Sequence, residues 1–174
     1  MSTEQNRKVA DELFAALSAG DIPGALALMT DDATWVAAGR REDLPAAGTY
    51  DKRRLEKLFK AMLGQLKNGL KMTLKGSIAE GDKLSLEAES LGHLTNGRTY
   101  NQYYHFFIEF RTGKICTVRE YLDTQHAFNV WYAKEVTRLT TTRLNRKFAC
   151  RPFVTTSSVS TSLVEGPHQS WKNH

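Results

Sequence analysis

The N-terminal part of the chain shows apolar residues at helical spacing, interrupted by short polar breaks. Over residues 5–19 the apolar positions recur with a helical period, and Gly20 ends the pattern. A polar run at 30–32 closes the next helical stretch, and charged and small residues fill a loop at 39–48. The pattern predicts helices over 5–19, after Asp21 and after Asp51, and a short strand over 33–38.

From residue 71 onward the apolar residues alternate with polar ones, which is typical of β-strands. Turn residues follow at near-regular intervals, and Asn96-Gly97 is the strongest hairpin signal among them. Strands joined by tight turns form an antiparallel meander. The predicted strands cover 71–79, 84–94, 99–110 and 115–123, and an aromatic-rich segment at 125–134, helical or extended, follows them.

Helices followed by a long antiparallel sheet indicate an α+β fold. The strand predicted at 99–110 spans on the order of 40 Å, so the sheet must twist and curve. If the sheet curls around the helices that it buries, the result is a cone with a closed end and an open mouth. Cones of this kind often hold a ligand pocket.

Charge divides the chain into two parts. Residues 1–135 hold 18 of the 24 Lys and Arg and 18 of the 19 Asp and Glu, so the net charge of +5 belongs to residues 136–174. That segment is rich in Ser and Thr and has no sustained period, which predicts a disordered or loosely packed tail after one folded domain at 1–135. Nucleic-acid binding by the domain is therefore not favoured.

Several classes of site find no support in the sequence. No apolar run is long enough for a membrane span, and the polar N-terminus has no signal-peptide core, so a cytoplasmic protein without membrane contact is expected. Cys116 and Cys150 form no metal or redox spacing, and no phosphate-binding glycine motif occurs. We therefore expect no metal site.

One carboxylate is conspicuous on the last predicted strand. The apolar face of that strand is predicted to carry Cys116, Val118, Glu120 and Leu122, and the opposite face Ile115, Thr117, Arg119, Tyr121 and Asp123. An acid among apolar side chains loses hydration, which raises its pKa toward the range useful for proton transfer near neutral pH. The alternative is that Glu120 lies at a wet rim or in a buried ion pair, for instance with Arg98.

Three segments together resemble the SnoaL-like branch of the NTF2-like (ketosteroid isomerase-like) superfamily. They are AGDIPGALALMTDDATW, NGRTYNQYYHFFIEFRTGKI and REYLDTQHA, and the resemblance covers about residues 5–132. It implies an α+β cone with a deep apolar pocket, a homodimer formed through the outer sheet face, and no metal or organic cofactor. It also implies a pocket carboxylate that acts as general acid or base.

The resemblance assigns roles residue by residue. In the limonene epoxide hydrolase relatives, the two pocket acids fall on Glu120 and Glu89, and the arginine between them falls on Glu87. The residues that hold the attacking water fall on Trp35 and Ala37. A triad without its arginine argues against epoxide hydrolysis. In ketosteroid isomerases the base falls near Trp35, where this chain has no acid. Polyketide cyclases use a single acid as base, and they are therefore the closest chemical fit.

Further residues complete the predicted pocket. Tyr104 and Gln102 share a strand face, and both can donate hydrogen bonds to a ligand carbonyl, although aromatic core packing is the simpler interpretation of Tyr104. His105 is a candidate base for a dehydratase, with a packed histidine as the alternative, and His126 is interpreted as a surface partner of Asp123. The predicted substrate-binding residues are Trp35, Gln102, Tyr104, Val118 and Leu122.

Two functional interpretations remain, and a third, nucleic-acid binding through the tail, rests on charge alone. One is a cofactor-free isomerase or cyclase that binds a small apolar molecule, with Glu120 or Glu89 as general acid or base. The other is a non-catalytic binding or assembly module that uses the same pocket or the outer face of the sheet. Epoxide hydrolysis and dehydration are less favoured alternatives.

Overall fold

Residues 2–133 are described by the computed structural model, and the segment predicted as a tail lies outside the described residues. The helices are α1 (Thr3–Ala19), α2 (Ile22–Ala27), α3 (Lys52–Leu63) and α4 (Thr124–Trp131). The strands are β1 (Met29–Ala37), β2 (Gly48–Asp51), β3 (Leu66–Glu80), β4 (Lys83–Leu94), β5 (Thr99–Arg111) and β6 (Lys114–Leu122). The predicted α+β order is confirmed. Within the described residues, no helix combines the length and the apolar character that a membrane crossing requires.

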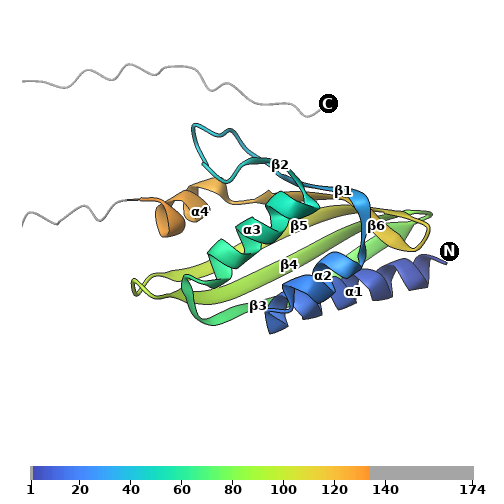
Figure 1. Ribbon diagram of the computed structural model, residues 1–174, viewed down its shortest axis with the longest axis horizontal. Helices are drawn as coiled ribbons and strands as arrows, with labels where there is room; N and C mark the ends of the chain where they lie inside the picture. Colours follow the sequence, from blue (N-terminus) through green and yellow to red (C-terminus); the bar gives the residue numbers. More distant parts are fainter. Residues whose placement is uncertain (1, 134–174) are drawn as a thin grey trace, which may run out of the picture. The chain divides into compact units, whose positions relative to one another are not determined.

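The strands form one sheet in the order β2-β1-β6-β5-β4-β3. Strands β3 to β6 make the predicted antiparallel meander, and β1 pairs with β6 in parallel. The turn after β4 contains Gly97 at φ 89°, a backbone conformation that favours glycine. Figure 1 shows α1, α2 and α3 in front of the curved sheet, with α4 at one end of it.

Three elements differ from the sequence prediction by more than a shift of one or two residues at an end. Strand β2 lies partly in the predicted loop, because it pairs with β1. Strand β3 begins at Leu66, where it pairs with the end of β4. Strand β1 includes Asp31 and Asp32, which were predicted to be a break. Their side chains are exposed and paired with Lys52 and Arg111, so their charges do not oppose strand formation.

Strand β6 also departs from strict alternation. Its register against β5 shifts between Glu109 and Phe110, so Phe110 pairs with Ile115 while Glu109 pairs with Thr117. The shift turns Ile115 into the core, where it is fully buried, although simple alternation put it on the outer face. Because the irregularity precedes Val118, the inward orientation of Glu120 is kept.

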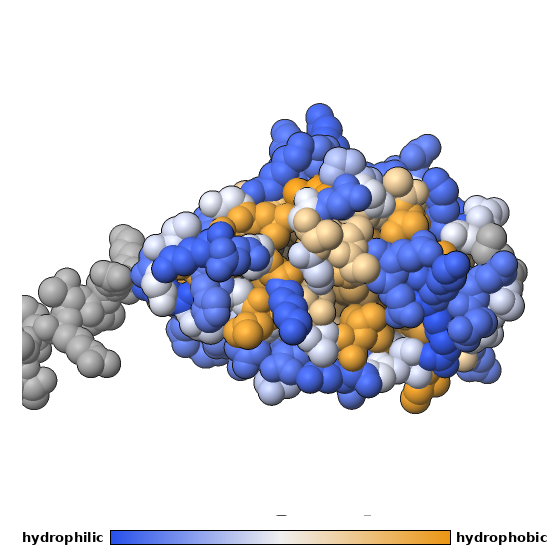
Figure 2. Space-filling view, turned by 90° about the horizontal axis from the view of Figure 1, so that it is seen from below, coloured by the Kyte–Doolittle hydropathy of each residue, from blue (hydrophilic) through white to orange (hydrophobic). Residues whose placement is uncertain are grey.

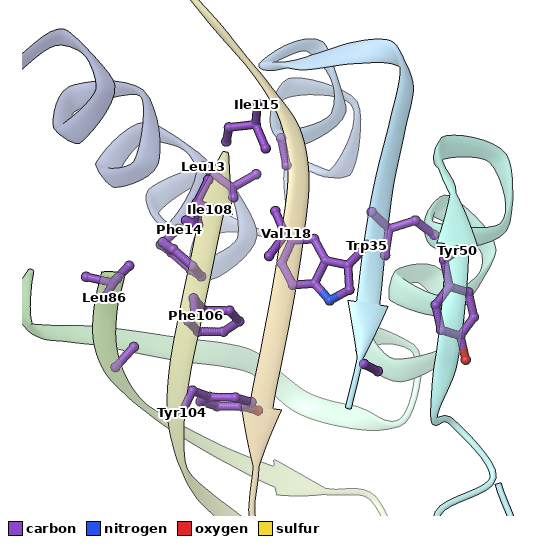
Figure 3. Close-up of a cluster of buried hydrophobic side chains, with 14 of the residues drawn as sticks. Leu13, Phe14, Trp35, Tyr50, Leu86, Tyr104, Phe106, Ile108, Ile115 and Val118 are labelled. Atoms are coloured by element: carbon purple, nitrogen blue, oxygen red, sulfur yellow. The ribbon is translucent and has the colours of Figure 1, made fainter. Parts of the chain in front are cut away.

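The core lies between the helices and the inner face of the sheet. The rings of Phe14 on α1 and Phe106 on β5 contact each other with centroids 4.8 Å apart, and Figure 3 shows these two side chains facing each other beside Trp35 and Tyr104. Asp51 caps α3 as predicted, accepting a 2.7 Å hydrogen bond from the backbone of Arg54. This packing holds α3 over the sheet face that carries Glu120.

Candidate functional site

The position of Glu120 is set by strand pairing on both sides. On β5 its partner is Phe106, and on β1 its parallel partner is Ala37. The backbone carbonyl of Glu120 also accepts a 2.8 Å hydrogen bond from Ala38. The carboxyl group therefore projects from the middle of the sheet into the space beneath α3.

One side-chain donor contacts the Glu120 carboxyl directly. The indole Nε1 of Trp35 donates a hydrogen bond of 2.6 Å to Oε2. Burial raises the pKa of Glu120 to about 7, and the bond from Trp35 acts in the opposite direction. Among residues 2–133, no cation forms an ion pair with it. A carboxyl with this pKa is able to give and take a proton near neutral pH.

Two small cavities meet at Glu120, and we call them the first and the second lobe. The first has a volume of about 70 Å³ and the second about 130 Å³. Glu120, Leu58 and Met62 border both lobes, so the residue keeps partial exposure although protein surrounds its carboxyl. The other walls of the first lobe are apolar, apart from Tyr104 and Trp35.

Part of the first-lobe wall reaches the surface of the molecule. Leu17, Leu70 and Met72, from α1 and β3, line this lobe and are only partly buried. Figure 2 looks at the side where Figure 1 places α1 and β3, and it shows apolar surface gathered in the middle of this face. An apolar ligand would meet matching surface there.

A chain of hydroxyl groups runs along the inner face of the sheet to the second lobe. Ser90 Oγ donates to the hydroxyl of Tyr104 at 3.4 Å, and Tyr104 donates to the hydroxyl of Tyr100 at 3.0 Å. Burial raises the pKa of Tyr100 to about 12 and that of Tyr104 well above its usual value. Both phenols therefore stay protonated, and Tyr100, which lines the second lobe, keeps its proton for another acceptor.

The structure brings four of the predicted site residues together around the cavities. Trp35, Tyr104 and Glu120 border the first lobe, and Leu122 and Glu120 border the second. Val118 is fully buried in the core and is not part of either wall. Its predicted contact with a ligand is therefore corrected to a packing role.

Gln102 also has a structural contact in place of the predicted ligand contact. Its side chain is buried, and Nε2 donates a 2.8 Å hydrogen bond to the carbonyl of Asp123. Asp123 in turn caps α4, accepting a 3.0 Å bond from the backbone of His126. Gln102 thus fixes the start of α4, and its amide donor is not directed at the cavities.

Glu89 lies away from the cavities, which corrects its placement beside Glu120. Its neighbours on β4, Ala88 and Ser90, are buried, so alternation turns Glu89 to the outer face. There it pairs with Lys75 at 2.8 Å and accepts a 2.9 Å hydrogen bond from Asn101. Asn101, first, and Lys75 lower the pKa of Glu89 through these bonds. It is an ion-paired surface acid.

Two histidines occupy places that differ from the predicted ones. His105 is exposed and hydrogen-bonded to Ser85 at 2.8 Å, on the strand position that pairs with the exposed Glu87. It therefore does not share a site with Glu120. His126 was predicted to pair with Asp123 at the surface. Its ring instead stacks on the ring of Tyr100, with centroids 5.6 Å apart.

Most of the second lobe was not predicted from the sequence, and two of the missed residues carry donors, Tyr100 and Trp131. Tyr100 could have been assigned, because it shares the strand face of Tyr104 four residues away. Trp131 closes the lobe from the last turn of α4, and the sequence carried no signal for it beyond a cluster of aromatic residues. Among the residues that the structure describes, no group of three potential metal ligands occurs.

Comparison with known proteins places the chain in a family. The sequence profile of the SnoaL-like domain matches residues 10–118, more than half of the chain. No protein with curated annotation matches significantly.

Solved structures share the fold. An NTF2-like protein from Burkholderia xenovorans is 26% identical, with a TM-score of 0.60, over 75% of this chain and 98% of its own. TerC, co-crystallised with polyporic acid, is 19% identical, with a TM-score of 0.64, over 72% of this chain and 97% of its own. An LEH-like epoxide hydrolase of M. tuberculosis is 19% identical, with a TM-score of 0.60, over 73% of this chain and 89% of its own. The chain belongs to the SnoaL-like domain family and has the NTF2-like fold.

Proposed function

We propose that the protein binds a small, mostly apolar molecule in the two lobes and moves a proton beside its carbonyl group without a cofactor. The reaction class is that of isomerases and cyclases. The observation that carries the proposal is the carboxyl of Glu120, which is surrounded by apolar walls and held by one hydrogen bond from Trp35. Burial sets its pKa at about 7.

The proposed reaction develops negative charge on the carbonyl oxygen of the ligand. Glu120 as a carboxylate takes a proton from the carbon next to a carbonyl. The C–H electron pair forms the carbon–carbon double bond of an enolate, and the π electrons of the carbonyl move onto its oxygen. Return of the proton to the same or another atom completes an exchange or an isomerisation. A donor near the oxygen stabilises the enolate. Tyr100 is better placed for this than Tyr104 or Gln102, because the latter two already donate within the protein.

Epoxide hydrolysis remains less favoured. The paired acids and central arginine of that mechanism would fall on Glu120, Glu89 and Glu87. Both Glu87 and Glu89 lie on the outer face of β4, away from the cavities. The solved epoxide hydrolase noted above, at 19% identity, supports the shared fold and no shared chemistry.

Deuterium exchange at carbon tests the proposal. With 1-tetralone in D₂O, native protein is expected to accelerate exchange at the carbon beside the carbonyl, measured by proton NMR. Glu120→Gln is expected to lower the protein-dependent rate at least about 100-fold, the typical range for an acid–base group. Glu89→Gln is the matched control and should retain the native rate. Equal rates in native protein and Glu120→Gln would refute the assignment.

A second candidate function uses the outer face of the sheet. Tyr103 is 66% exposed there and Tyr121 is 49% exposed. The ion pairs of Lys75 with Glu89 and of Arg119 with Glu109 neutralise charge on the neighbouring strand positions. A surface that combines exposed aromatic rings with internally paired charges favours contact with a second copy. We infer a homodimer through this face, whether the protein is an enzyme or a non-catalytic binding module.

A further inference from the structure

One buried donor in the second lobe has no partner. The indole Nε1 of Trp131 is inaccessible to solvent and makes no hydrogen bond within residues 2–133. Two other buried polar side-chain atoms share this condition, Oδ1 of Asn6 and Nε2 of His126, but neither residue borders a lobe. Since buried donors are nearly always paired, an unpaired one on a residue that lines a cavity calls for an acceptor there, such as a bound water or a ligand oxygen.

Tyr100 brings a second donor to the same place. Its ring contacts the Trp131 ring edge to face, with centroids 5.2 Å apart. Its hydroxyl oxygen accepts from Tyr104, so its own proton is not used in that bond and is free for an acceptor. The nearby indole N–H acts to lower the pKa of the Tyr100 phenol, against the larger effect of burial, although its contact with the phenol lacks the geometry of a hydrogen bond. The two donors are therefore close together and both available.

Trp131 is held in position from both ends of α4. Gln102 and the cap of Asp123 fix the start of the helix, at 2.8 and 3.0 Å. Arg98 donates to the carbonyls of Asn129 and Val130, at 3.2 and 3.1 Å, beside Trp131 at the end of the helix. A cation at a helix C-terminus is also electrostatically favourable. The donor pair is thus built on an anchored element.

The walls of the second lobe limit the charge of the ligand. They contain no Lys, Arg or His, and their acid is Glu120. An anionic ligand would meet no compensating charge there, and a cation would find two donors pointing at it. A neutral oxygen acceptor satisfies both donors. The lobe has a volume of about 130 Å³, close to the cavity of about 150 Å³ that accommodates benzene in another protein.

We infer that Trp131 and Tyr100 form an oxygen-binding subsite that takes the carbonyl of a neutral ring ketone. The ring carrying the carbonyl lies in the second lobe, and the apolar remainder of the ligand extends past Glu120 into the first. This orientation places the carbon next to the carbonyl at the junction, beside the Glu120 carboxyl. The inference rests on the proposed function and adds the chemical class of the ligand and its orientation across the two lobes.

The test compares two probes of the same shape. Tetralin is 1-tetralone without its oxygen, so the ratio of their dissociation constants, measured by NMR titration of the full chain, isolates the subsite. Native protein is expected to bind 1-tetralone roughly 3- to 10-fold more tightly, the range of one or two net hydrogen bonds. Trp131→Phe should reduce that ratio toward one, and because the ratio compares two probes of the same shape, a change in wall packing that affects both probes cancels. Tyr100→Phe should act in the same direction.

A measurement on the native protein covers the case in which the variants fail to fold. The indole N–H resonance of Trp131 should move when 1-tetralone binds and not when tetralin binds. Equal affinities for the two probes, or an indole resonance indifferent to the carbonyl, overturns the subsite while the role of Glu120 stands. If neither probe binds, both the subsite and the proposed ligand-binding function are overturned.

Discussion

The indole of Trp35 donates a hydrogen bond of 2.6 Å to the carboxyl of Glu120 across the parallel strands β1 and β6. Two opposing effects meet in this contact. Burial disfavours the charged carboxylate, whereas the bond from the indole favours it. Their balance leaves the pKa of Glu120 at about 7, a value suited to both donating and accepting a proton at neutral pH.

Removing the indole donor should shift that balance. In Trp35→Phe the pKa of Glu120 is expected to rise above its native value, since the remaining effect is burial. The variant should lose about 1–3 kcal/mol of unfolding free energy at pH 8, where the carboxylate is left unpaired. At pH 5, where the acid is neutral, the loss should be smaller. Urea unfolding at the two pH values measures both.

A double-mutant cycle isolates the contact between the two side chains. If the loss in Trp35→Phe arises from the unpaired carboxylate, it should largely vanish in a Glu120→Gln background. An equal loss in both backgrounds would mean that packing of the indole against Phe59 and Phe106, and not the hydrogen bond, accounts for the effect.

Stability should fall as pH rises through the range between the two pKa values of Glu120. The ordinary value is 4.5 and the folded value about 7, so within this window the folded protein binds more protons than the unfolded chain. The stabilisation is fully present below about pH 4.5 and is lost above pH 7, by roughly 3 kcal/mol. Urea unfolding from pH 5 to 8 measures the slope.

Glu120→Gln should flatten this profile and be more stable than native protein at pH 8. Glu89→Gln is the control. The pKa of Glu89 is lowered by Asn101 and Lys75, so its stabilisation is present above its ordinary pKa of 4.5 and is lost only at lower pH. An unchanged slope in Glu120→Gln would contradict a buried, protonated Glu120.

Met62 borders both lobes together with Leu58. Met62→Ala should widen the junction between the lobes and admit a larger ketone such as anthrone, at a cost of about 2–3 kcal/mol in unfolding free energy. Leu63→Ala is the matched control, because Leu63 borders the first lobe alone. NMR titration should detect anthrone binding to the Met62 variant only. Binding by both variants would mean that general loosening opens the cavity.

The outer face of the sheet gives a prediction about assembly. Native protein should sediment as a dimer, and Tyr103→Asp with Tyr121→Asp should sediment as a monomer with an unchanged circular dichroism spectrum. The new charges would lie in the middle of the interface without partners. Lys57→Glu, on the exposed side of α3, should remain dimeric. A native monomer would refute the dimer and leave the cavity chemistry unaffected.

The local sequence pattern predicted the antiparallel strands and the helix cap, whose formation depends on neighbouring residues. The alternation and the turns of β3 to β6 follow from period and turn chemistry, and Asp51 was recognised as a helix cap. Strand β1 pairs with β6, although Trp35 and Glu120 are 85 positions apart in the sequence. This pairing depends on tertiary contacts, which a short sequence segment does not indicate. The same is true of β2, whose strand character depends on its neighbour β1.

The site was predictable to the same extent. Alternation identified Glu120 because the register irregularity of β6 lies upstream of it, although the same irregularity misplaced Ile115. Glu89 shows the converse: correspondence with relatives put it in the cavity, and the alternation of β4 takes it out. Trp131 acquires its position from the anchoring of α4 by Gln102 and Arg98, which depends on contacts between distant parts of the chain.

The most direct test of the account is the pKa of the Glu120 carboxyl in the native protein. Carbon-13 NMR of the glutamate side-chain carboxyls, followed from pH 3 to 9 and assigned with Glu120→Gln, resolves this group. The account predicts one glutamate that titrates at about 7, whereas Glu89 titrates below its ordinary value of 4.5. A Glu120 that titrates near 4.5 would be hydrated or ion-paired, and the proposed proton transfer would lose its basis.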